Sequence, residues 1–294
     1  MACNCDSFVR SSAWDSQTFT SLIVFAVLLA CGNPLPAQAG IETHWIGGHG
    51  RWTDASKWSA GLPNAFKRTV VGGDSTVVVP AGNFLASLLD VGTHRGDRAR
   101  VEVNGGRLLV RQDSLIVGEE TGGEGTFVLN SGTVQSAMDV FIGGATGSSD
   151  RMNKSALVIN GGSFLGLTLT VGSGLGSEST VRINGSRASS IVALEFVEFV
   201  AETDPGGTPG QSTLSFTLDS HGVTPITIPS RWTGLRIEHD AQSHCFLRIA
   251  LSAPPPNGDV LLVSSRVPTR GAFDGLPEGS EVSAQYAGRT YRWT

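Results

Sequence analysis

Residues 101–118 read VEVNGGRLLVRQDSLIVG. In this stretch an apolar pair leads to an Asn-Gly-Gly turn, and a second apolar pair is closed by a glycine. The same two-part signature recurs about every 25 residues, a spacing typical of a solenoid, in which each repeat buries its apolar face against its neighbours. The four turns contain Asn104, Asn130, Asn160 and Asn184, and the four closures are Gly92, Gly118, Gly143 and Gly172.

The apolar pairs alternate with other residues, as the side chains of a half-buried strand do. The residues one and three places before each turn Asn are apolar, whereas the residue between them varies from Glu102 to Val158 and Arg182. The residues one and three places before each closing Gly repeat the pattern. Because a period of two indicates strands, and strands stack about 4.8 Å apart, we predict an all-β fold. The predicted architecture is a parallel β-helix with an N-terminal cap and a C-terminal β-rich module.

The Asn and Gly residues of the repeat are interpreted as structural. A sharp bend needs a positive φ, which Gly adopts freely and Asn tolerates. Asn side chains stacked from one repeat to the next can also form a hydrogen-bonded ladder. We therefore expect the turn Asn and closing Gly residues to shape the corners rather than to bind a ligand or catalyse a reaction.

The first 39 residues have the features of an export signal. The apolar run at residues 22–30 is too short to span a bilayer, and Ala37-Gln38-Ala39 follows the small-x-small pattern of a signal-peptidase site. Export would place the protein outside the cell, on its surface or in the periplasm, with no transmembrane span after cleavage. A competing interpretation takes residues 28–31 as a lipobox, which would leave a lipid-bearing Cys31 at the mature terminus.

Composition narrows the range of partners. Cys245 is the one cysteine after residue 39, so an internal disulfide is excluded in the mature chain, and a small core residue is the expected role. The net charge is −5 and there is no run of Lys or Arg, which makes DNA, RNA and anionic membranes poor candidates. Glycans and other surface proteins are the expected partners, and no cofactor is expected.

Three tryptophans mark the start of the mature chain. Trp45, Trp52 and Trp58 lie in a Gly-rich stretch within residues 40–72, which we interpret as a cap over the open apolar end of the first repeat. A sugar-stacking platform made by the same indoles is the alternative. The β-solenoid repeats are expected over residues 73–200. Residues 201–294 form either a continuation of the solenoid or a C-terminal β-rich segment.

Several motifs together resemble a known class of proteins. They are the opening from Trp45 to Trp58, the Asn-Gly-Gly and Val-Gly repeats, and the segments DSHGVTPI (219–226) and GAFDGLPEG (271–279). Nearly the whole mature chain is similar to exported bacterial proteins with autotransporter-associated β-strand repeats. The resemblance implies a surface or secreted right-handed parallel β-helix with no established enzymatic site.

Parallel β-helices also include polysaccharide lyases and hydrolases, which need carboxylates from neighbouring repeats that converge on one groove. Asp113 and Asp139 are the candidate catalytic pair, since both lie nine places after their turn Asn. Counted back from the closing Gly, however, they are five and four places away, which would put them on opposite faces unless a bulge reconciles the registers. We interpret them as solvated outward carboxylates.

His239 and His244 are the candidate metal ligands. They lie near Glu238, Asp240 and Cys245, which are residue types that bind metals, but the spacing is not an established zinc pattern. Their alternation with apolar neighbours favours ordinary strand faces, and no metal is expected.

The favoured function is a non-enzymatic exported or cell-surface β-solenoid with a structural or adhesion-type role, because coil geometry accounts for nearly every distinguishing residue. The alternatives are a carbohydrate-active β-helix enzyme and a glycan-binding module that uses Trp45, Trp52 and Trp58.

Overall fold

The computed structural model describes residues 41–119, 122–144, 153–277 and 279–293. Two units are distinguished, Met1–Ala39 and Gly40–Thr294, and the strands given below all belong to the second. The predicted export signal and the lipobox alternative at Cys31 lie outside the described residues.

The described part of the chain is almost entirely β structure. Nineteen of its strands belong to one large sheet and two form a separate antiparallel hairpin, while its helical element is the short 3-10 helix η1 (Ala55–Lys57). The strands are β1 (Ile41–His44), β2 (Gly48–Arg51), β3 (Lys67–Val71), β4 (Asp74–Val79), β5 (Asn83–Ala86), β6 (Leu88–Val91), β7 (Arg98–Val110), β8 (Leu115–Val117), β9 (Glu124–Ser136), β10 (Val140–Ile142), β11 (Lys154–Ile159), β12 (Gly162–Val171), β13 (Glu178–Asn184), β14 (Ala188–Ala201), β15 (Gln211–Leu218), β16 (Ile226–Ile228), β17 (Leu235–His239), β18 (His244–Leu251), β19 (Val263–Ser265), β20 (Val282–Tyr286) and β21 (Arg289–Trp293).

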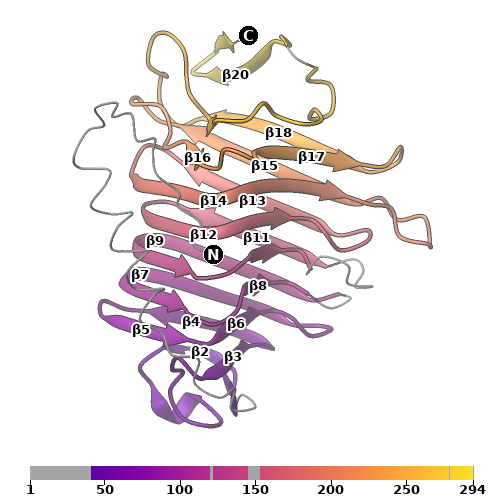
Figure 1. Ribbon diagram of the computed structural model, residues 1–294. Coiled ribbons are helices and arrows are strands. Elements are labelled where there is room, and N and C mark those ends of the chain that lie inside the picture. The colour runs from indigo at the N-terminus through magenta and orange to yellow at the C-terminus, as the bar shows by residue number, and fades with distance from the viewer. Residues whose placement is uncertain (1–40, 120–121, 145–152, 278, 294) are drawn as a thin grey trace, which may run out of the picture. The chain divides into compact units, whose positions relative to one another are not determined.

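The strands of one repeat pair in parallel with the equivalent strands of the next. One such series runs from β4 through β7, β9, β11, β13 and β15 to β18. Figure 1 shows these strands stacked in chain order. The pairing is consistent with a parallel β-helix. It does not stop near residue 200, because β17, β18 and β19 still pair in parallel with the preceding repeat.

The apolar doublets that were predicted to point inward are buried. Their side chains are at most 2% exposed, belong to one continuous core and stack in register, as Val101 does on Phe127 and Leu115 on Val140. Full burial of one such side chain contributes roughly 1.5–3 kcal/mol, so this column is a main source of stability. The doublets are Val101 and Val103, Phe127 and Leu129, Leu157 and Ile159, Val181 and Ile183, Leu89 and Val91, Leu115 and Val117, Val140 and Ile142, and Leu169 and Val171.

A second inward column contains only small residues. Its register positions hold Ser75, Ala99, Gly125, Ser155, Ser179, Ser212 and Cys245, all of them buried. The closing glycines pack against this column: a Cβ on Gly143 would lie 1.8 Å from Ser179 Oγ, and Gly118 and Gly172 approach their own serines as closely. The closing Gly residues also have positive φ, so two independent constraints require glycine there.

Cys245 occupies the last position of the small column, in agreement with its predicted role as a small core residue. Its side chain is fully buried, and burial together with the nearby Asp274 carboxylate raises the pKa of the thiol to about 12. Because the thiolate is the reactive form, we expect iodoacetamide to leave Cys245 unmodified in the folded protein and to modify it in concentrated guanidinium chloride. Mass mapping of the Cys245 peptide measures both rates, and equal rates would contradict the burial.

The corners contain the predicted asparagine ladder. The Nδ2 atoms of Asn130, Asn160 and Asn184 each donate to Oδ1 of the preceding Asn, at 2.8, 2.6 and 2.7 Å, and the series begins at Asn104. The positive φ at these corners belongs to glycines such as Gly105, because the described non-glycine residue with a positive φ is Ala287 alone. The expectation that Asn shares the positive-φ role was therefore wrong. β7 and β9 run through their corners, with a register shift there instead of a strand end.

Asn130→Ala should lower the free energy of unfolding by about 1–2 kcal/mol, because Asn130 both donates to Asn104 and accepts from Asn160. Asn104 makes only the first of these two ladder bonds, so Asn104→Ala should cost about half as much. Urea unfolding of the two variants measures the difference. Equal stability of both variants and the original protein would show that the ladder adds nothing to stability.

Candidate functional site

The three predicted sugar-stacking tryptophans are core residues. Trp45, Trp52 and Trp58 are 5%, 1% and 3% exposed, and Trp58 packs edge-on against both of the others at 5.0 and 5.2 Å between ring centroids. The indole N–H of Trp58 donates to the Trp52 carbonyl at 2.9 Å. These indoles offer no face to a sugar, so the glycan contact proposed for them is corrected.

The candidate catalytic acids do not converge. Val140 pairs with Leu115, so Asp139 lies level with Ser114 and one position out of step with Asp113. Each carboxylate has its own hydrogen-bond donor: Asp113 accepts from the Ser114 amide at 2.8 Å, and Asp139 accepts from the Thr168 hydroxyl at 2.7 Å. This register disfavours a carboxylate pair that acts on one sugar.

His239 and His244 come together on a carboxylate that the sequence did not link to them. His239 Nε2 lies 3.3 Å from Asp274 Oδ1, and His244 Nδ1 lies 2.9 Å from Asp274 Oδ2. The Cys245 amide also donates to Asp274 at 3.1 Å, which fastens the segment around Asp274 to β17 and β18. Within the described ranges, no group of three or more His, Cys, Asp or Glu side chains is arranged to hold a metal ion.

Asp90 on β6 is a buried carboxylate with only one of its two oxygens hydrogen-bonded. Its side chain is fully buried; Oδ2 accepts from Arg68 Nε at 2.6 Å, while Oδ1 has no hydrogen-bond partner. Burial raises the pKa of Asp90 to about 6 against the opposing attraction of Arg68. Arg68 on β3 also lies 3.4 Å from Glu42 on β1. One guanidinium is therefore close to two carboxylates, which belong to the strands on either side of β3.

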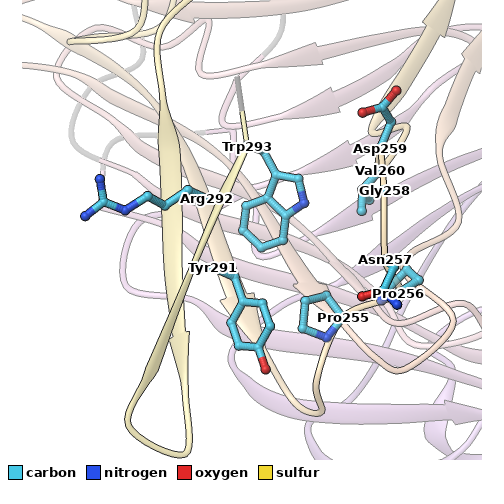
Figure 2. Close-up of a pocket in the computed structure, with 9 residues that line it drawn as sticks. All are labelled: Pro255, Pro256, Asn257, Gly258, Asp259, Val260, Tyr291, Arg292 and Trp293. Carbon is cyan, nitrogen blue, oxygen red and sulfur yellow. The ribbon is translucent and has the colours of Figure 1, made fainter.

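A groove of about 450 Å³ lies between the loop at residues 255–260 and β21 (Figure 2). We call it the hairpin groove. Tyr291 and Trp293 form one wall, and the other wall contains Pro255, Pro256 and Asn257. Arg292 also lines the groove, but because alternate side chains of a strand point to opposite faces, its guanidinium points away from the two rings. There it pairs with Glu281 at 3.0 Å, which leaves an aromatic wall without a cation.

The aromatic wall is held in place from behind. β20 and β21 form an antiparallel hairpin, and Ala287 and Gly288 at its turn both have positive φ, as a type I′ turn requires. Trp293 lines the hairpin groove on one side. On the other side it lines an apolar cavity of about 180 Å³ with Val260 and Leu262, and it packs against the core.

Sequence reasoning missed the hairpin groove. No site residue was predicted in the loop at residues 255–260 or in β21. The available signal was the alternation of two aromatic residues at positions 291 and 293, which predicts that both point to the same face of a strand.

A comparison with protein-family models finds no match to the chain, and neither the search of curated proteins nor the search of solved structures finds one. As for membrane crossing, the described residues contain no helix with the length and apolar character to span a bilayer. The function proposed for this chain therefore depends on the register of the sheet, the Asn ladder and the hairpin groove.

Proposed function

We propose that this chain is a non-enzymatic exported or cell-surface protein with a structural or adhesion-type role, and that its parallel sheet is wound as a β-helix. The observation that carries the proposal is the register. Equivalent side chains of successive repeats contact one another, from the buried doublets to the Asn ladder. Such a stack depends only on neighbouring repeats, and it suits an extended scaffold.

The proposal includes membership of the class with autotransporter-associated β-strand repeats. The apolar residues just before the corners and closures that suggest this class pair in register from repeat to repeat, as Val103 does with Leu129 and Ile142 with Val117. Residues 40–72 act as the N-terminal cap in this proposal, supported by the burial of Trp45, Trp52 and Trp58 in the core. Residues 1–39 act as the export signal.

Export is tested in the cells that produce the protein. We expect an antibody to find the protein in the medium, on the surface or in the periplasm, and mass spectrometry to find a new N-terminus near residue 40. A lipid on Cys31 would select the lipobox alternative. An intact N-terminus together with retention in the cytoplasm would overturn the proposal.

Catalysis is tested separately with purified protein and a panel of polysaccharides. We expect chain lengths to stay unchanged on prolonged incubation. Depolymerisation that Asp113→Asn or Asp139→Asn abolishes would instead support the carbohydrate-active enzyme.

A further inference from the structure

We propose that the hairpin groove binds a neutral oligosaccharide. Its volume of about 450 Å³ lies within the usual range for small-ligand sites. It also combines two aromatic rings with polar groups, the two kinds of lining that fix a small ligand and its orientation. This inference gives a ligand class to the adhesion-type role proposed above, and it depends on that role for its biological meaning.

The aromatic wall suits the apolar face of a sugar ring. Figure 2 shows the rings of Tyr291 and Trp293 on the same side of β21, facing the opposite wall across the groove. Tyr and Trp present a large rigid surface at low cost in side-chain entropy, and each also carries one hydrogen-bonding group. The packing of Trp293 against the hydrophobic core restricts its indole before a ligand arrives.

The opposite wall suits the hydroxyl groups of a sugar. Asn257 contributes an amide that both donates and accepts, and the backbone at Gly258 adds further donors and acceptors. Sugar hydroxyls can use both kinds of group. A proline-rich peptide would fill an aromatic groove with its own prolines, whereas here Pro255 and Pro256 already stand opposite the aromatic rings.

Charge selects a neutral glycan over an acidic one. Asp259 stands at the rim of the groove and is its one carboxylate, whereas the guanidinium of Arg292 is directed away and paired with Glu281. A uronic-acid polymer would therefore bring its carboxylates toward Asp259 without a cation to accept them.

The test is isothermal titration of the full-length protein with four neutral hexasaccharides, namely those of cellulose, chitin, mannan and xylan. Polygalacturonate and a decaproline peptide are the competing probes. We expect at least one hexasaccharide to bind with a Kd of about 10 µM to 1 mM, which corresponds to a modest free energy of binding. Tyr291→Ala and Trp293→Ala should each weaken that binding by about tenfold or more, since each removes one ring of the wall.

Trp232 supplies the matched control. It is 86% exposed and lies outside the hairpin groove, so Trp232→Ala should leave the affinity unchanged. Trp293→Phe keeps a ring in the wall and should retain most of the binding, and this distinguishes loss of contact from loss of the hairpin. Unchanged circular dichroism and thermal midpoint of Tyr291→Ala provide the second check on folding.

Three results would overturn the inference: no hexasaccharide binds, polygalacturonate or decaproline binds in place of the hexasaccharides, or both ring deletions keep full affinity. Each of these results leaves the export test untouched, because that test measures location and N-terminal processing. The failure of the ligand class is therefore distinguishable from the failure of the structural or adhesion-type role.

Discussion

Asp90→Asn is expected to raise the free energy of unfolding by about 3 kcal/mol near neutral pH. The pKa of Asp90 is about 6 in the folded protein, against an ordinary value of 3.8 for an aspartate side chain, so the folded state holds the proton more tightly than the unfolded chain. Asn keeps the shape of the side chain and removes the buried charge. Urea unfolding near pH 8 measures the gain.

The pH dependence follows from the direction of this shift. Since the folded state binds the proton more strongly, the original protein loses stability through this group as the pH rises from about 4, and the loss is complete above about 7. Asn does not titrate, so the Asp90→Asn variant should lack this decline. Below about pH 4 the two proteins should be nearly equally stable, because Asp90 is then neutral in both states.

Asp97→Asn is the matched control. Asp97 is also buried, but its Oδ1 accepts from the Gly73 amide at 2.6 Å and its Oδ2 from the His94 amide at 3.0 Å. Asn would turn one of these acceptors into a donor, so this variant should be destabilised by about 1–3 kcal/mol. If Asp90→Asn also lowers stability at pH 8, the attraction of Arg68 outweighs the cost of burial and the expectation for Asp90 is wrong.

The repeat could be predicted from the sequence because its signals are local. Alternation identifies the strands, and each doublet before Asn104 or Gly118 packs on the doublet of the next repeat, so neighbouring repeats suffice to explain its burial. The role of Cys245 followed from the same alternation. The expectation for Asn failed in part because every corner holds an Asn and a Gly within two residues of each other, and composition cannot say which of them has the positive φ.

The site residues could not be predicted because their environment is not local. The burial of the three indoles depends on how the folded chain packs Trp58 against both Trp45 and Trp52, and a Trp-rich sequence suits a core as well as a binding face. The partner of His244 is Asp274, thirty residues further along the chain, and no spacing rule links them. The hairpin groove needs the loop at residues 255–260 beside β21, which only the folded chain brings together.

Gly143→Ala is expected to lower the free energy of unfolding by about 3 kcal/mol. Gly143 has a φ of 96°, where a residue with a Cβ costs roughly 1–2 kcal/mol. The new Cβ would also lie 1.8 Å from Ser179 Oγ and 3.0 Å from Ser179 Cβ, and such overpacking costs about 1–3 kcal/mol more. Urea unfolding with a fixed m-value measures the total loss of stability. A loss below about 1 kcal/mol would show that the closing glycines do not pack tightly against the column of small residues.

Two further variants separate backbone strain from the clash. Gly207 has a φ of 84° with no atom near its missing Cβ, so Gly207→Ala should show the strain alone, about 1–2 kcal/mol. In the double variant Gly143→Ala with Ser179→Gly, the two Ser179 atoms that the new Cβ would meet most closely are removed. A double-mutant cycle should then return a favourable coupling of about 1–3 kcal/mol. Zero coupling would mean that the closures require glycine only because of its positive φ. It would also mean that the column of small residues packs independently of the closing glycines.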